Sequence, residues 1–333
     1  SITGMDTALY PILWIVFYAI FLALNIYGVA LSYKVTLVVT LISLAVLVVF
    51  WISAIPNMDF GRWALNIGVG EDGKAVELPE GNGSWFPFGW QGVLATLPFA
   101  VWLFLAIEQV PLAAEESVDP KRDLPRGILL GFATLVLSAF MIVLLNPSVM
   151  GIGSYALGTS LEPLLDGFRA IYGDAGATVL GIVALTGLIA SFHTILYAQG
   201  RQVYSLSRAG YFPSALSVTH AKYKTPHLAM ISGALLALAV MLFIWFANGG
   251  GGAGETQLGD DLIGTVLLNM AVFGAMLSYI MQAISFILLR RNQPTIERPF
   301  RSPLGIPGAV LTVIIAGVTL FYQLQDPNFF RGV

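Results

Sequence analysis

Residues 93–114 read VLATLPFAVWLFLAIEQVPLAA, an apolar run that is interrupted by Glu108 and Pro111. A bilayer core about 30 Å thick requires roughly 20 apolar residues in a helix. The run has that length, so it predicts a transmembrane span that carries a carboxylate at membrane depth. The fold to expect is therefore a membrane helix bundle that contains this span.

Glu108 is costly at that depth, and acidic residues within spans usually face a cavity or a partner and mark a transport pathway. Pro111 lacks a backbone N–H, and its ring disfavours continuous helix just before it. We therefore expect the span to break within residues 106–109. Broken helices at mid-membrane are where transporters bind ligands and ions. In the alternative interpretation, Glu108 caps a half-helix or pairs with a neighbouring backbone group.

The rest of the chain supports the membrane class. Of 333 residues, 57% are apolar and 11% are charged, whereas soluble domains carry about 25% charged residues. This composition excludes a disordered chain, and a net charge of −3 disfavours a nucleic-acid partner. Seven further apolar runs are long enough to span, which predicts an all-α polytopic bundle of eight spans: 9–31, 35–55, 128–145, 175–198, 228–247, 262–289 and 304–324.

The basic residues orient these spans, because Lys and Arg are enriched in cytoplasmic loops. One side of the membrane holds twelve of the 16 Lys and Arg residues: Lys34, Lys121, Arg122, Arg126, Arg201, Arg208, Lys222, Lys224, Arg290, Arg291, Arg298 and Arg301. The other side holds Arg62, Lys74, Arg169 and Arg331. We predict cytoplasmic loops at 115–126, 200–227 and 290–303, with Ser1 and Val333 outside. The predicted outside loops at 57–90 and 248–261 are Gly-rich and acidic, and a short surface helix is expected at 161–172.

The sequence contains no recognisable enzyme or cofactor motif. Gly68 to Gly73 matches the dinucleotide fingerprint by letter, but that motif requires a preceding strand and a following helix. Here it falls in an acidic outside loop, so we interpret it as loop. There is no cysteine, and hence no disulfide or thiolate metal site. We expect no enzyme activity, no cofactor and no bound metal.

Several polar and aromatic residues within the spans are further candidates. His193 lies in the fifth span, where the membrane surroundings favour a function, although a lone histidine more often packs. Ser191 and Thr194 can bind substrate or an ion, or can instead hydrogen-bond their own helix carbonyls. Trp102 and Phe104 can form a cation–π wall or pack as apolar groups. For Asn269, Tyr279 and Gln282, interhelical hydrogen bonding is the default interpretation.

Three stretches together identify a family. FLAIEQVPLAAEE at 104–116 continues into DPKRDLPRG at 119–127, and ASFHTILYAQGRQVYSLSRAGYFP occupies 190–213. RRNQP at 290–294 is followed by RPFRSP at 298–303. These stretches resemble the sixth span, the eighth span and the loop after the tenth span of the amino acid–polyamine–organocation (APC) superfamily of permeases. The first two most resemble bacterial ethanolamine permeases.

The resemblance implies a transporter fold of two inverted five-helix repeats within twelve spans. The eight spans of this chain are similar to spans four to eleven, so the chain is expected to lack about three N-terminal spans and the last. Residues 1–56 would end the first repeat, 57–90 would form an extracellular loop, 91–291 would form the complete second repeat, and 292–333 would add one further span.

The resemblance also assigns substrate-binding roles. Trp102 matches the aromatic gate position of the sixth span. Ala106 stands where many members have glycine at an unwound point, and alanine favours helix. Ile107 and Glu108 match an apolar-then-acidic pair.

The ion-coupling candidates are Ser43, Ser191 and Thr194. Ser43 stands about where some proton-coupled members carry a lysine that is thought to mimic a bound sodium ion. Because this chain has serine at that position, the lysine-based proton mechanism is not expected here. Ser191 and Thr194 lie in the region of the eighth span that faces this site. The coupled ion, a proton or sodium, is left open, as are uniport and exchange.

The sequence thus predicts import of a small amine, most closely ethanolamine, across a bacterial cytoplasmic membrane by alternating access. Glu108, Trp102 and Phe104 would meet the ammonium group, and His193 would meet the hydroxyl group or relay a proton. The first alternative is an amino acid permease of the same superfamily. A transporter-like receptor and a membrane-embedded enzyme are alternatives of other classes. The receptor would normally carry a signalling domain. The enzyme would need a catalytic pair on facing spans.

Overall fold

The computed structural model describes residues 9–27, 29–160, 162–247, 257–298 and 300–325. Within them, eight helices are long and apolar enough to cross a membrane, which confirms the predicted number of spans and the all-α polytopic class. Residues 248–256, which form most of the predicted extracellular loop at 248–261, are not among the described residues. Both ends of the chain, with Ser1, Arg331 and Val333, also lie outside them. The orientation across the membrane stays a prediction.

The elements follow the apolar runs closely. In chain order they are α1 (Tyr10–Tyr27), α2 (Val29–Ala54), a 3-10 turn (Ile55–Asn57), a π turn (Phe60–Ala64), β1 (Ile67–Val69), β2 (Ala75–Glu77), α3 (Gly89–Ala95), α4 (Leu97–Phe104), the 3-10 helix η4 (Ile107–Glu116), α5 (Pro120–Leu145), a 3-10 turn (Asn146–Ser148), α6 (Gly153–Leu157), α7 (Pro163–Arg208), a 3-10 turn (Ser214–Ser217), α8 (His227–Ala247), α9 (Gln257–Asn292) and α10 (Gly305–Gln325).

Proline and glycine set several of the boundaries. Pro56 and Pro147 lie in the short turns that directly follow α2 and α5. Within α7, Gly173 has φ 68° and ψ 179°, so the backbone turns a corner there. Residues 163–172 therefore form a helix of their own, which confirms the short surface helix predicted at 161–172 over its described part.

The chain forms two compact units that interleave in the sequence. The first unit comprises Ser1–Gly83 and Phe140–Gly254, and the second comprises Ser84–Ala139 and Glu255–Val333. In the first, α1, α2, α7 and α8 pack against one another. In the second, α10 packs against α3, α4 and α9, and α4 also packs against α3 and α9. The predicted division into repeats groups the sequence differently and stays a prediction.

The largest core of the first unit lies where the surface helix 163–172 meets α2. Phe50 and Phe168 have no exposed surface, and their rings meet edge to face with centroids 5.4 Å apart. Such aromatic pairs contribute about 0.5–1.5 kcal/mol beyond the area they bury. Elsewhere, apolar side chains such as Ile52 and Phe243 are exposed, as expected for spans whose outer faces contact lipid rather than water.

The loop at 57–90 contains a small sheet. Strands β1 and β2 pair antiparallel, and at the turn Gly70 N–H donates to the Lys74 carbonyl oxygen over 2.9 Å. Gly68 to Gly73 therefore form one edge and the turn of a hairpin, without a following helix. The interpretation of this fingerprint as loop is confirmed.

The core of the second unit positions the break in the third span. Val101 and Leu105 pack with Tyr279 against a cluster of Val272, Met276 and Ala316 from α9 and α10. These apolar contacts hold the end of α4 against α9 directly before the break.

Candidate functional site

The predicted break in the span of Glu108 is present, and it begins one residue earlier than expected. Helix α4 ends at Phe104, and Leu105 is extended with φ −65° and ψ 156°. Ala106 follows with φ 79° and ψ −6°, in the left-handed region. For a residue with a Cβ that conformation costs roughly 1–2 kcal/mol. The span therefore unwinds at Ala106 although alanine favours helix.

After the break the chain continues as η4, a 3-10 helix of 10 residues. Runs of 3-10 helix longer than three or four residues are uncommon, and they often mark a hinge or a strained sequence. Pro111 lies inside η4. In an α-helix its ring would clash with the carbonyl group four residues earlier, which here belongs to Ile107. The proline thus explains why the second half of the span is not an α-helix.

Glu108 lies in the first turn of η4, and its carboxylate has a partner from another helix. The Tyr279 hydroxyl of α9 donates to Glu108 Oε2 over 2.8 Å, and both side chains are half-buried. A hydrogen bond to an ionised acceptor is about twice as strong as a neutral one. The alternative interpretation, in which Glu108 only caps a half-helix or pairs with backbone, does not describe this contact.

Tyr279, the partner of Glu108, was named from the sequence as a polar group within a span and not as a binding residue. Interhelical hydrogen bonding was its default interpretation, and that prediction is confirmed. The same prediction was wrong for Gln282, whose amide donates to Ser278 of its own helix over 3.0 Å. At Asn269 it is the backbone carbonyl that accepts from Gln323 of α10, over 2.7 Å. A polar residue in an apolar run signals that a partner exists, without saying which.

The other predicted binding residues of the second unit surround the break. Trp102 and Phe104 belong to the last turn of α4, and Ala106 and Ile107 connect it to Glu108. Trp102 is 46% exposed within the structure. The Phe104 ring lies 6.1 Å from the ring of Phe132, tilted by 44°. The structure thus brings these residues together along one short stretch of backbone.

A pocket in the second unit is lined by Tyr279, the hydrogen-bond partner of Glu108. It has a volume of about 370 Å³ and lies between α9 and α10, with Tyr279, Gln282 and Thr312 in its lining. Two glycines, Gly305 and Gly308, also line it. The tyrosine that binds Glu108 therefore has a second side that faces an open volume.

The predicted site residues His193, Ser43, Ser191 and Thr194 belong to the first unit. His193 is 2% exposed, and its Nδ1 lies 3.2 Å from Asn25 Nδ2 of α1. Asn25 was not a sequence candidate. Its position inside the first apolar run, where a polar side chain needs a partner, is the signal that could have found it.

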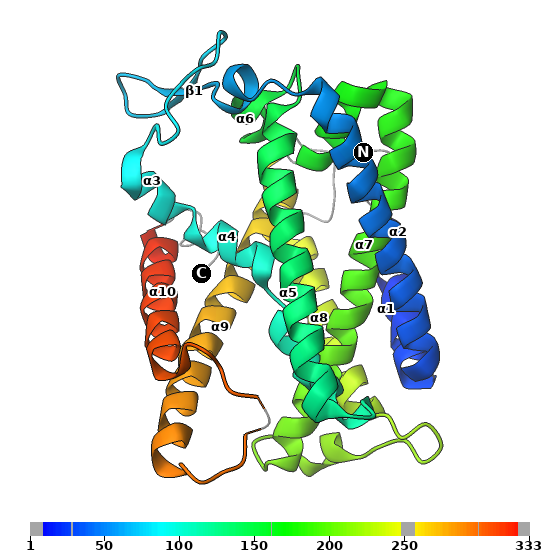
Figure 1. The fold of residues 1–333 in the computed structure, drawn as a ribbon. Coiled ribbons are helices and arrows are strands. Elements are labelled where there is room, and N and C mark those ends of the chain that lie inside the picture. Colours follow the sequence, from blue (N-terminus) through cyan, green and yellow to red (C-terminus); the bar gives the residue numbers. More distant parts are fainter. Residues whose placement is uncertain (1–8, 28, 161, 248–256, 299, 326–333) are drawn as a thin grey trace. The chain divides into compact units, whose positions relative to one another are not determined.

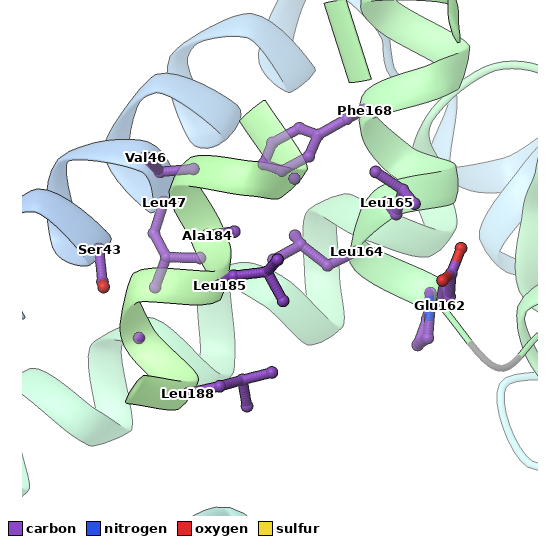
Figure 2. A pocket seen from close by; sticks show the side chains of 13 residues that line it. Ser43, Val46, Leu47, Glu162, Leu164, Leu165, Phe168, Ala184, Leu185 and Leu188 are labelled. Atoms are coloured by element: carbon purple, nitrogen blue, oxygen red, sulfur yellow. The ribbon is translucent and has the colours of Figure 1, made fainter. Parts of the chain in front are cut away.

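Ser43 lines a different pocket, shown in Figure 2. This pocket has a volume of about 560 Å³ and lies between α2, α7 and the surface helix, with Val46, Leu185 and Leu188 in its mostly apolar lining. The Ser43 hydroxyl donates to the Val39 carbonyl oxygen over 3.0 Å. These contacts give Ser43 a structural role beside any role in coupling.

The hydroxyl groups of Ser43 and Thr194 bind backbone and neighbours. Ser43 Oγ lies 3.1 Å from Thr186 Oγ1 of α7. Thr194 Oγ1 donates to the Ala190 carbonyl oxygen of its own helix over 2.8 Å, as its alternative interpretation stated. Ser191 lies one turn earlier and is exposed. Their roles as ion-coupling residues stay predictions.

Comparison with known proteins identifies the family, because a model described as "Amino acid permease" matches residues 3–329. The chain belongs to the amino acid permease family. The predicted membership of the APC superfamily is thereby confirmed, and the chain belongs to a multi-pass membrane protein.

Relatives of this chain are transporters by name. An uncharacterized transporter of Rhizobium meliloti is 28% identical over 322 residues, which cover 96% of this chain and 61% of the relative. The methylthioribose transporter of Bacillus subtilis is 24% identical, over 75% of this chain and 49% of the relative. The branched-chain amino acid permease BcaP of Bacillus subtilis is 26% identical, over 72% and 47%. The chain therefore spans about half to three-fifths of the length of these relatives.

Proposed function

We propose that the protein imports a small amine, ethanolamine, across a bacterial cytoplasmic membrane by alternating access. The observation that carries this proposal is the carboxylate of Glu108 at a break in a membrane-spanning segment, with Tyr279 holding it in place. Charged residues within spans are expensive and are retained where they bind a substrate, an ion or a partner charge.

The groups at the break suit a cation. The carbonyl groups at the C-terminal end of an α-helix carry a partial negative charge, and α4 ends at Phe104, directly before the break. Glu108 adds a full negative charge. Trp102 and Phe104 add aromatic faces, which attract ammonium groups within about 6 Å of the ring centre. An amine without a carboxylate needs these groups and no anion site.

An amino acid permease is the second candidate. The first turn of η4 presents backbone N–H groups next to the break, and such ends bind the carboxylate of a substrate in other transporters. One relative is named as a branched-chain amino acid permease. In this case Glu108 would bind the amino group, and the helix end would bind the carboxylate of the same substrate.

Import of a cation does not require a coupled ion. A membrane potential of about 100 mV contributes about 2.3 kcal/mol per charge, which corresponds to roughly fiftyfold accumulation. Uniport therefore suffices for ethanolamine, and symport with a proton or sodium ion would add to it. Ser43, Ser191 and Thr194 are the residues we propose for such coupling.

Uptake of labelled ethanolamine by cells that express the full-length protein tests the proposal. Glu108→Gln removes the charge and retains the size, so we expect uptake at low substrate concentration to fall about ten- to hundredfold, the range for a hydrogen bond to a charged group. Glu71→Gln in the exposed hairpin is the matched control and should transport normally. Unchanged affinity and rate for Glu108→Gln would remove Glu108 from the site.

Competition separates the two substrates. An excess of unlabelled branched-chain or aromatic amino acids should leave ethanolamine uptake unaffected if the amine is the substrate. Strong competition, together with uptake of a labelled amino acid, would favour the amino acid permease. The absence of ethanolamine uptake by the unaltered protein would reject the amine as substrate.

A further inference from the structure

The pocket of Figure 2 has the size of a ligand site and an almost wholly apolar lining. Its volume is about 560 Å³, and binding sites for small molecules commonly measure about 300–1,000 Å³. The whole lining belongs to the first unit, on α2, on α7 and on Glu162 directly before α7. Its two polar side chains, Ser43 and Glu162, lie at opposite ends. An occupant of this pocket must therefore be apolar along most of its length.

Small residues on α7 shape this space. Gly181, Ala184 and Gly187 line the pocket at intervals of three residues, so they lie near one another on one face of the helix. Gly181 and Ala184 leave room beside α2. At Gly187 the helices come close, because an added Cβ would lie 3.1 Å from Ser43 Oγ. The pocket therefore narrows at its Ser43 end.

The pocket extends over the depth of one leaflet of a bilayer. Its outer end lies at Glu162, before the surface helix, and the chain enters the span at Gly173. The helix from Gly173 to Leu188 is about 22 Å long. Half of a bilayer with its headgroups measures about 20–22 Å. The lining thus reaches from the polar interface to about the middle of the membrane.

One wall of the pocket is open to the side of the helices. Leu185 and Leu188 line the pocket, yet they are 46% and 68% exposed. Both belong to a span, so the surroundings that they meet there are hydrocarbon. An empty volume beside them would lose dispersion contacts on one side. The acyl chain of a lipid is the apolar group that a bilayer supplies at this depth.

The outer end of the pocket is negatively charged. The Arg169 guanidinium is shared by three carboxylates, at 3.5 Å from Glu162, 2.6 Å from Asp166 and 3.8 Å from Asp174. One base and three acids together carry a formal charge of −2. The Glu162 side chain lines the pocket and is about half exposed. An ammonium group can donate to this carboxylate, whereas a headgroup with only a phosphate is repelled.

We propose that this pocket binds one acyl chain of a phospholipid and that Glu162 binds the ammonium group of the same lipid, so that phosphatidylethanolamine is preferred. The chain would lie along Leu185 and Leu188 and end near Ser43. The Ser43 hydroxyl already bonds the Val39 carbonyl group and contacts the Thr186 hydroxyl. That end therefore needs no polar partner from the lipid. The proposal is independent of the transported substrate.

Photo-cross-linking of the purified full-length protein in nanodiscs tests the occupant. The probe is phosphatidylethanolamine with a diazirine at the end of one acyl chain, and mass spectrometry should find it on peptides that contain residues 43–47 and 181–188. Ala184→Phe fills the pocket and should lower this labelling about tenfold. Val179→Phe makes a comparable addition at an exposed position of α7 outside the lining, so labelling should stay the same.

Two results would overturn the acyl-chain site. Equal labelling of Ala184→Phe and Val179→Phe would place the chain elsewhere. If the unaltered protein carried the probe on other exposed spans and not on these peptides, another part of the full-length protein would occupy the pocket.

Competition by unlabelled lipids tests the headgroup in the unaltered protein, without relying on a variant that fills the pocket. Phosphatidylethanolamine should compete with the probe about fivefold better than phosphatidylglycerol, the factor for one charge at a membrane surface. Glu162→Gln should remove most of this preference, and Glu71→Gln in the exposed hairpin should keep it. Equal competition by both lipids in the unaltered protein would overturn the role of Glu162.

Discussion

Two interruptions of the long helices share a positive φ and differ in the residue that adopts it and in its surroundings. At Gly173, in the first unit, α7 turns a corner with φ 68° and ψ 179°. At Ala106, in the second unit, the third span breaks with φ 79° and ψ −6°. Glycine adopts positive φ at little steric cost, whereas alanine does not. The first interruption is therefore unstrained, and the second stores strain.

The difference separates a structural corner from the place where we propose a binding site. A Cβ added at Gly173 would have nothing within 4 Å, so its glycine serves the backbone alone. Ala106 lies two residues before Glu108, whose carboxylate is bound by Tyr279. Strained backbone persists where its surroundings over-determine it, and it clusters at functional sites. The residue at a break, as well as the break itself, therefore supports the proposed role of this segment.

The largest expected effect concerns the corner. The helix before Gly173 carries Phe168, which is fully buried against Phe50. Phe168→Ala would leave a cavity and should lower the free energy of unfolding by about 3–5 kcal/mol, measured by thermal unfolding of the purified protein. Arg169→Ala, on the same helix with exposed ion pairs, should cost less than about 1 kcal/mol. Equal losses would mean that packing does not hold the corner.

The next effect concerns the break. Tyr279→Phe removes the hydroxyl that donates to Glu108, which corresponds to about 1.5–3 kcal/mol for a hydrogen bond to a charged group. We expect kcat/KM for uptake to fall about ten- to hundredfold. Tyr322→Phe on α10 is the control and should transport normally. If both variants transport alike, the break is a structural turn like the corner at Gly173.

Gly173→Ala tests whether the corner depends on its backbone conformation. A combination of φ near 70° with ψ near 180° is essentially restricted to glycine, and other residues there cost about 1–3 kcal/mol. The melting temperature should fall, while uptake per folded molecule stays the same. Gly131→Ala in α5, where a Cβ also has nothing within 4 Å, should not lower the melting temperature. A loss of uptake in folded Gly173→Ala would give the corner a functional role.

The smallest effect has the opposite sign. Ala106→Gly relieves the left-handed strain, so the protein should gain about 1 kcal/mol in stability. Ala113→Gly, further along η4 at a residue without positive φ, should instead lose stability. A loss of stability in Ala106→Gly would show that the break is not strained, and the contrast with Gly173 would disappear.

Much of the fold follows from the order of apolar and polar residues. The length of each run predicts a span, and Pro and Gly predict where it ends or bends, so the eight spans, the surface helix before Gly173 and the break before Glu108 were all predictable. Pro111 and Glu108 together indicated the break from local chemistry alone, because each is unfavourable in a continuous apolar helix.

The partners of the polar side chains were not predictable. Tyr279 lies far from Glu108 in the sequence, and Asn25 far from His193. Which polar groups meet depends on how whole helices pack, and helical periodicity does not contain that information. The position of Tyr279 in the sequence of its span is equally consistent with a hydrogen-bond partner on α10. The sequence could thus predict Glu108 as a carboxylate at membrane depth. Only the structure shows that Tyr279 is its hydrogen-bond partner.

The interleaved second unit has a consequence for how the protein is made. Glu108 and Tyr279 are 171 residues apart, and ribosomes add about 5–20 residues per second. The broken span thus leaves the ribosome roughly 10–30 s before its tyrosine exists. During that interval a carboxylate must enter the bilayer without this partner. Membrane insertion is therefore a stage at which this part of the chain lacks a contact that the folded protein has.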